Sequence, residues 1–235
     1  STLVHSTPRT SSKTESLKYM SDTSIKIVEE AADIAKHFLG KLLDPATEEG
    51  GGILSDTVKF WRFKNKVNLT LKAKEFLEGK GINPRRVLPK TLYPILENGS
   101  LEEDGDMQTR WSAMLAHAAD PTSLVKVRPS YPEILKQLSP LEVRLLDWFY
   151  EAIKDKPLDE QKVSGIVKEK VLNIFGISAK EYEILVENLF RLGLCQTPSS
   201  DGGMTIGGHP IVIRTYDFIK ITPLGEDFIK SCKYS

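Results

Sequence analysis

Apolar residues recur at helical spacing through most of the chain. From Thr23 to Leu43 they fall three or four positions apart, which predicts a helix, and Asp44-Pro45 ends it because the residue before proline avoids the α region. A longer helix is predicted from Ile53 to Gly79, with apolar residues on more than one face, as in an internal element of a helical bundle. Further helices are predicted over Pro89 to Glu97 and from Ser100 onward.

Capping signals mark the starts of several predicted helices. Three segments carry Ser followed three positions later by Glu, at Ser100, Ser139 and Ser178. This is the pattern of a capping box, in which each side chain accepts a hydrogen bond from the other residue's backbone. The helix after Ser100 is expected to close at Asp120-Pro121, and another helix is expected over Asp159 to Phe175.

The pattern changes after Gly193. β-branched and aromatic residues predict short strands, and a glycine-rich segment from Pro198 to Pro210 predicts a flexible loop between them. A last helix is expected from Leu224 to Cys232, capped by Thr222-Pro223. Helices, a hairpin with a long tip and a closing helix follow in the order of a winged helix. The strands are expected at Leu194 to Thr197, Ile211 to Ile213 and Tyr216 to Ile221.

The predicted fold class is therefore mainly α, in two domains. Proline residues punctuate the chain between Pro121 and Pro140, and a domain boundary is placed near Arg128. Residues 1–22, rich in Ser and Thr and without an apolar signal segment, are expected to form a disordered arm. Residues 23–128 are expected to form a helical domain, and residues 129–235 a winged-helix-like α+β domain.

Composition excludes some classes of protein. The 235 residues hold 32 Lys and Arg against 32 Asp and Glu, which argues against a globally basic nucleic-acid binder. Cys195 and Cys232 cannot build a disulfide framework, and free thiols suit a reducing cytoplasm. No apolar run approaches the roughly 20 residues that a membrane span needs.

No constellation of residues predicts catalysis. The four histidines are widely separated and lack partners at metal-ligand spacing, so no metal site is predicted. Gly50-Gly51-Gly52 is not followed by the Lys and Ser or Thr of a phosphate-binding loop. The chain is therefore expected to have no catalytic residues and no cofactor, and not to be an enzyme.

One segment departs from the even charge balance. From Lys59 to Lys90 there are ten basic residues and only Glu75 and Glu78 oppose them. This segment predicts a surface for an anionic partner, and the favoured competing interpretation is a solvated helix whose cations pair with acids such as Glu102. Trp61, within the segment, is expected to be a structural residue. The candidate basic face comprises Lys59, Arg62, Lys64, Lys66, Arg85 and Arg86.

The predicted recognition helix of the winged helix argues against DNA reading. Between Ser178 and Gly193, two basic residues face three glutamates, a net charge of minus one, whereas phosphate contacts need positive charge. A protein partner is therefore expected. A DNA-binding transcriptional regulator and a membrane-active effector at an anionic membrane surface stay as alternatives.

Several short motifs are specific when taken together. They are Gly51 to Asp56 with Trp61 to Asn65, "KEFLEGKGI" from Lys74 with the following Pro84, "SLEED" from Ser100, "RWSAMLAHAADP" from Arg110, "YPEILKQLSPLEVRLLD" from Tyr131 and "ITPLGEDFIKSC" from Ile221. With these motifs the chain resembles the abortive-infection alpha family of bacterial phage-defence proteins over roughly residues 24–232. The resemblance implies a non-enzymatic role in abortive infection and supplies no catalytic or ligand residues.

Overall fold

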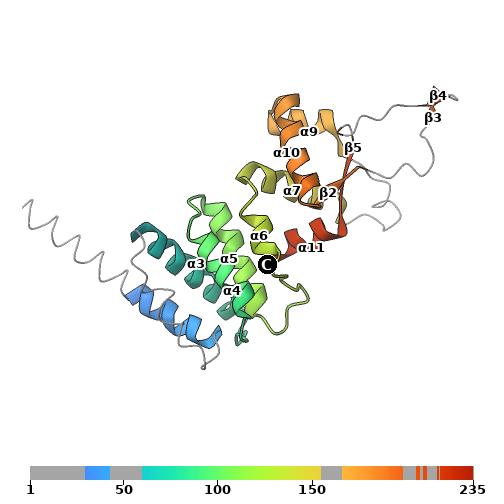
Figure 1. The fold of residues 1–235 in the computed structure, drawn as a ribbon. Coiled ribbons are helices and arrows are strands. Elements are labelled where there is room, and N and C mark those ends of the chain that lie inside the picture. Colours follow the sequence, from blue (N-terminus) through green and yellow to red (C-terminus); the bar gives the residue numbers. More distant parts are fainter. Residues whose placement is uncertain are drawn as a thin grey trace, which may run out of the picture.

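The computed structural model describes residues 30–42, 60–154, 166–197, 205–206, 209–210, 216 and 218–234. The described chain is mainly helical, with a helical bundle at one end and helices around a small sheet at the other (Figure 1). The mainly α prediction is therefore confirmed. The predicted arm over residues 1–22, the helix starts at Thr23 and Ile53, and the strand at Ile211 to Ile213 lie outside the described residues.

Four of the helices that the structure describes build the N-terminal bundle. A helix covers residues 30–42, followed by α3 (Phe60–Glu78), α4 (Pro89–Gly99) and α5 (Gly105–Ala119). α3 packs along α5, and α4 contacts both helices. Trp111 and Leu69 are fully buried in this packing, and the apolar residues on several faces of α3 fit its place between neighbours, as predicted.

The predicted capping box at Ser100 is wrong. Ser100 terminates α4, where its hydroxyl donates to the Glu97 carbonyl oxygen at 2.6 Å. α5 begins later, with Asp104 as N-cap, because the Asp104 carboxylate accepts from two backbone N–H groups, those of Asp106 and Met107, at 3.0 and 2.9 Å. An aspartate is at least as good an N-cap as serine, so the later start gives hydrogen-bond partners to backbone N–H groups in the first turn of α5.

The C-terminal part begins with α6 (Tyr131–Leu135) and α7 (Pro140–Ile153). The capping box at Ser139 is confirmed, because both reciprocal hydrogen bonds between Ser139 and Glu142 are present. Pro140 occupies the first helical position, as predicted. α9 (Lys168–Phe175) and α10 (Ala179–Arg191) follow. Ser178 caps α10 by accepting from the backbone of Glu181 at 3.2 Å.

A three-stranded antiparallel sheet has β5 (Phe218–Ile221) at its centre, between β1 (Ile166–Val167) and β2 (Cys195–Gln196). The prediction of continuous helix up to Phe175 is wrong at β1, where two β-branched residues pair with β5 instead. β3 (Thr205–Ile206) and β4 (His209–Pro210) pair with each other inside the segment predicted as loop.

α11 (Pro223–Ser231) closes the fold and returns the chain to the N-terminal bundle (Figure 1). Thr222 caps it, as predicted, by accepting from the Gly225 backbone at 2.9 Å. Trp111 of α5 and Tyr131, Phe149 and Phe228 beyond the predicted boundary belong to one hydrophobic cluster. The domain boundary near Arg128 stays a prediction, and the two parts share a continuous core.

Candidate functional site

The helical part of the predicted basic face is engaged in packing within the bundle. Lys66 of α3 is 3% exposed and forms an ion pair with Glu97 of α4. Arg62 donates to the same carboxylate at 3.1 Å and to the Ser100 hydroxyl at 3.3 Å. Asn65 donates to the backbone oxygens of Ser100 and Glu102 at 3.3 and 2.8 Å. These contacts join α3 to the end of α4, which fits a structural role better than binding.

The other cations of the segment have separate surroundings. Lys59 and the side chain of Trp61 lie outside the described residues, and Lys64 is exposed on α3. Lys74 pairs with Glu78 one helical turn on, at 2.6 Å. Along α3 these pairings fit the favoured interpretation, in which the cations of the segment pair with acids. That the candidate basic face binds a partner stays a prediction.

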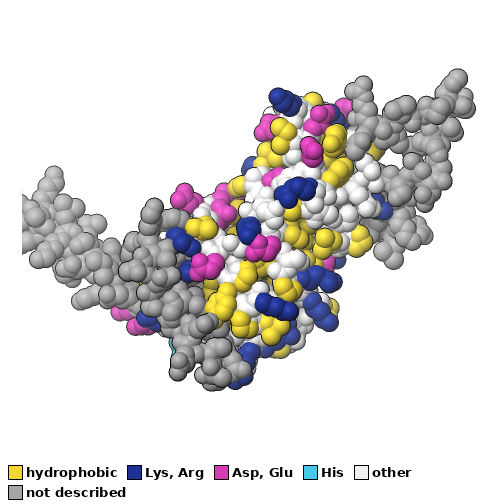
Figure 2. Space-filling view, in the orientation of Figure 1, with side chains coloured by type: hydrophobic (Ala, Val, Ile, Leu, Met, Phe, Trp, Pro, Cys, Tyr) yellow, Lys and Arg dark blue, Asp and Glu magenta, His cyan; other side chains and the backbone are white. Residues whose placement is uncertain are grey.

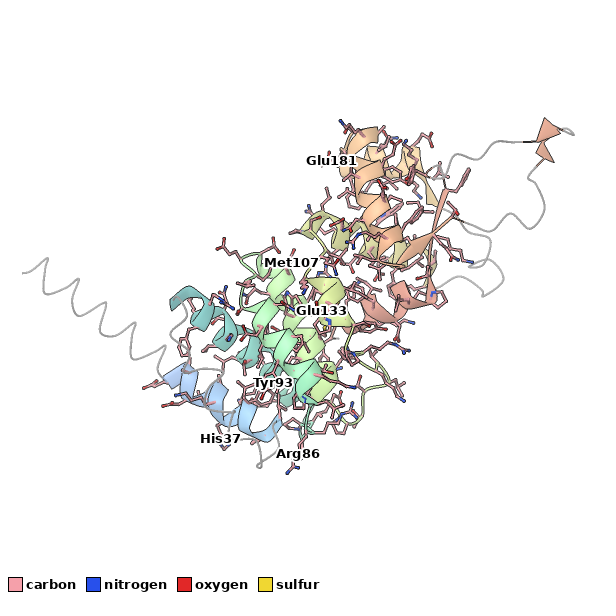
Figure 3. The ribbon with its side chains drawn as sticks, viewed as in Figure 1. His37, Arg86, Tyr93, Met107, Glu133 and Glu181 are labelled. Atoms are coloured by element: carbon pink, nitrogen blue, oxygen red, sulfur yellow. The ribbon has the colours of Figure 1, made fainter. Side chains whose placement is uncertain are left out.

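Arg85 and Arg86 lie in a different setting, in the lining of a groove of about 340 Å³. Both are exposed, and Lys126, a residue that the sequence did not single out, joins them from another loop. Figure 3 shows Arg86 at the lower edge of the molecule. The remaining lining of this cationic groove is mostly apolar: Val87, Leu88, Thr91, Ala118 and Val127.

Two segments without any acidic residue supply all the residues that line the cationic groove except Ala118. Gly79 to Thr91 carries four basic residues, and Pro121 to Ser130 carries two, with no Asp or Glu in either. Figure 2 shows Lys and Arg side chains among hydrophobic ones along the lower right edge of the described chain, where the loop between α5 and α6 runs in Figure 1. The groove therefore offers concentrated positive charge on a partly apolar floor.

Backbone hydrogen bonds fix the first of these segments. The N–H of Arg85 donates to the Ala119 oxygen at 2.7 Å, and the N–H of Val87 donates to the Leu42 oxygen at 2.8 Å. The Arg85 guanidinium also donates to the Ala118 oxygen at 3.2 Å. The chain that carries the two arginines is thus tied to the ends of two helices, and the groove is preformed.

The second segment is fixed by Asp120 and His117 at the end of α5. The Asp120 carboxylate accepts from the backbone and the hydroxyl of Thr122, both at 2.7 Å, and a ring nitrogen of His117 lies 2.8 Å from the Ser123 hydroxyl. These bonds set the path of the loop that carries Lys126 into the groove.

The match to a protein-family model decides the classification. Residues 64–232, more than half of the chain, match the family described as abortive infection alpha. The chain belongs to the abortive infection alpha family. The resemblance seen in the sequence is therefore confirmed. No curated protein and no solved structure matches the chain. The matched span contains the three cations of the groove, whereas Lys59 and Arg62 precede it.

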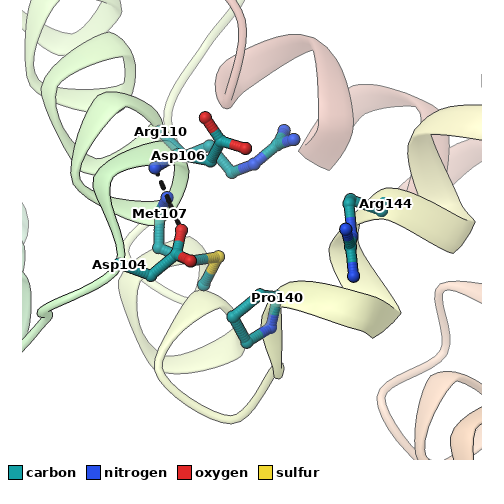
Figure 4. A pocket seen from close by; sticks show the side chains of 6 residues that line it. All are labelled: Asp104, Asp106, Met107, Arg110, Pro140 and Arg144. Carbon is teal, nitrogen blue, oxygen red and sulfur yellow. Dashed lines mark hydrogen bonds between the residues drawn. The ribbon is translucent and has the colours of Figure 1, made fainter.

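This abortive infection alpha protein has a second, smaller cavity of about 90 Å³, between the start of α5 and α7 (Figure 4). Asp104 and Asp106 lie on the α5 side, and Arg144 lies opposite on α7. Arg110 is also in its lining and pairs with Asp147 of α7. Its charges are of both signs and the space suits only a few water molecules, so it is a weaker candidate than the groove.

Tyr234 docks at the end of α5, the helix that supplies Ala118 to the groove. The Tyr234 hydroxyl donates to the Asp120 carboxylate at 2.8 Å, and its ring stacks on Phe76 with centroids 5.5 Å apart. Burial acts to raise the pKa of Asp120, but hydrogen bonds from Thr122 and Tyr234 outweigh it and hold the pKa below its ordinary value. Burial lowers the pKa of His117 despite its hydrogen bond to the Lys233 carbonyl oxygen. These bonds hold the Asp120 carboxylate inside the fold.

Two further findings concern chemistry. Burial raises the pKa of the Cys195 thiol, and it raises the pKa of Cys232 to about 12. Within the described ranges, no three His, Cys, Asp or Glu side chains are grouped so as to hold a metal ion. None of the helices that the structure describes is both long and apolar enough to cross a membrane.

Proposed function

We propose that this protein acts in abortive infection against phage by binding an anionic partner through the cationic groove, and that it does so without catalysis. Membership of the abortive infection alpha family supports the defence role. The observation that carries the binding site is the convergence of Arg85, Arg86 and Lys126 from two acid-free segments on one preformed groove.

The environment of the thiols favours binding over nucleophilic chemistry. A thiol attacks as its thiolate, and both cysteines are buried with pKa values well above the ordinary range. At neutral pH almost none of either residue is thiolate. Unpaired, buried cysteines also favour a reducing compartment, and we place the protein's action in the cytoplasm as part of the proposal.

We further propose that the C-terminal part is a winged-helix-like module that contacts protein and not DNA. The strand order β1–β5–β2 and the placement of α9 and α10 between β1 and β2 support the winged-helix arrangement. Glu181 and Glu187 are exposed on α10, and Lys168 pairs with Glu183 at 2.7 Å, so α10 presents no basic face to a duplex. Sub-micromolar, sequence-selective DNA binding that Arg191→Glu abolishes would contradict this part of the proposal.

The defence role is tested by infection of liquid cultures at two phage doses. Abortive infection sacrifices infected cells, so a culture that carries the protein should survive a low phage-to-cell ratio and collapse at a high ratio. A culture with Arg85→Glu/Arg86→Glu/Lys126→Glu should collapse at both. Its control is Lys36→Glu/Lys136→Glu/Lys154→Glu, which makes the same charge change at exposed lysines of the helix over residues 30–42, of the turn after α6 and of the end of α7. None of these three lysines lines the groove or lies on α9 or α10, so this control should protect like the wild type. Survival of the groove variant at the low ratio would refute the assignment of the groove.

A further inference from the structure

We propose that the partner of the cationic groove is the surface of an anionic phospholipid bilayer. This inference rests on the proposed function only in taking the groove as the contact site. The observation behind it is that two leucines stand exposed beside the cations. Leu124 is 97% exposed and Leu88 is 64% exposed, the two largest exposed fractions among the large apolar residues of the described chain.

One leucine lines the groove, and the other lies on the second of its two acid-free segments. Leu88 is part of its lining, and Leu124 lies two residues before Lys126 on the same loop. A single exposed apolar side chain needs no explanation. Here both flank the same set of cations, on the two segments that carry no acidic residue. Apolar side chains that project between lysines and arginines are the pattern of a protein surface that rests at the boundary of headgroups and acyl chains.

The chemistry of each part matches a part of the bilayer surface. Headgroup phosphates would meet the guanidinium groups of Arg85 and Arg86 and the ammonium group of Lys126, while Leu124 and Leu88 would enter the acyl boundary. The Asp120 carboxylate, which precedes the loop that carries Lys126, is 5% exposed as a residue and accepts hydrogen bonds from Thr122 and Tyr234, so it is not presented to the headgroups.

A bilayer explains the groove better than a soluble phosphate compound or a nucleic acid does. A soluble phosphate ligand would use the cations and leave Leu124 in water. A single strand of nucleic acid is bound through cations together with aromatic side chains on which bases stack, and none of the described residues that line the groove is aromatic. Only the bilayer uses the cations and both leucines.

The test is flotation of the purified full chain with vesicles. Vesicles of phosphatidylcholine alone are compared with vesicles in which a third of the lipid is phosphatidylglycerol, at low and at high salt. The chain should float with the anionic vesicles only, and less at high salt because the surface charge is screened. Each Lys or Arg near an anionic surface contributes about 1 kcal/mol, so Arg85→Glu/Arg86→Glu/Lys126→Glu should weaken binding by at least about a hundredfold.

Two further variants separate the contributions and guard against misfolding. Arg86→Glu/Lys126→Glu spares the structural bond of Arg85 to Ala118 and should still lose most binding. Leu124→Ser should weaken binding by about tenfold without changing the salt dependence. Ile184→Ser, which alters a residue 60% exposed on α10, is the matched control and should bind like the wild type. A thermal melt of each variant confirms that it is folded.

Three outcomes would overturn the inference. They are equal flotation with both kinds of vesicle, flotation that Leu124→Ser leaves unchanged, and binding of inorganic pyrophosphate by a chain that floats with neither vesicle. Failure here is distinguishable from failure of the proposed function, because the vesicle assay contains no phage. If flotation fails while the groove variant still loses protection, the groove keeps its role with another anionic partner. If the vesicles bind while the groove variant protects, the defence assignment fails alone.

Discussion

Replacing Tyr234 with Ala should destabilise the whole chain, although the residue lies next to the last position. Its hydroxyl bonds the Asp120 carboxylate, its ring stacks on Phe76 and meets His117 edge-on at 4.7 Å, and Lys80 lies 4.6 Å from its centroid. A hydrogen bond to a charged group contributes about 1.5–3 kcal/mol, and an aromatic pair about 0.5–1.5 kcal/mol. Because the contributions of one side chain do not add independently and the ring is only half-buried, we expect the free energy of unfolding to fall by about 2–4 kcal/mol.

Urea unfolding followed by tryptophan fluorescence measures this loss. The midpoint should fall while the slope stays constant, and the melting temperature should drop by roughly 5–15 °C for a chain of this size. Tyr234→Phe removes only the hydroxyl and should cost about half as much. Leu124→Ala, at a fully exposed site, is the control and should stay within about 0.5 kcal/mol of the wild type. A Tyr234→Ala chain as stable as this control would show that the tail contributes nothing to the fold.

Three other predictions concern the fold. The pKa of His117 is below its ordinary value of 6.5 in the folded chain, so its contribution to the free energy of unfolding is complete above pH 6.5 and should be lost as the pH drops below that value. Chemical denaturation at pH 7.5 and 5.5 should show the loss, and His117→Gln should make it smaller. Gly225→Ala places a Cβ 2.2 Å from the Leu194 oxygen and should cost at least about 1–3 kcal/mol in urea unfolding, whereas Gly105→Ala, with open space around the new methyl, should cost nothing. The fragment Pro129–Ser235 should melt cooperatively by calorimetry, but below the whole chain because its core is shared; a melt without a transition would contradict the predicted boundary.

Helix positions were largely predictable because local signals determine them. Ser139 begins a helix through bonds to residues within one turn, and helical periodicity located α4. Local signals do not decide the start of α5, because Ser100 and Asp104 are both suitable N-cap residues. The tertiary contact of Ser100 with Arg62, and the better placed Asp104, decide between them. β1 is a similar case, because Ile166 and Val167 become strand only through a partner some fifty residues later in the chain.

The candidate site was predictable only in part. Local charge identified Arg85 and Arg86, but the same criterion included Arg62 and Lys66, which bond to Glu97 of α4. Lys126 was missed because it lies well beyond the charged segment from Lys59 to Lys90 and joins the arginines only through the fold of the loop after α5. The available signal was the absence of acidic residues from Gly79 to Thr91 and from Pro121 to Ser130. In this chain, acid-free stretches indicate the cationic groove better than counts of basic residues do.

The most direct test of the central claim asks whether defence depends on the charge of the groove. Plating efficiency of a phage that the wild type restricts is compared between Arg85→Glu/Arg86→Glu/Lys126→Glu and the charge-conserving variant Arg85→Lys/Arg86→Lys/Lys126→Arg, both at matched expression and with unchanged melts. We predict that the reversed variant plates phage as cells without the protein do, whereas the conserved variant still restricts it. Full restriction by a folded, charge-reversed protein would contradict the claim.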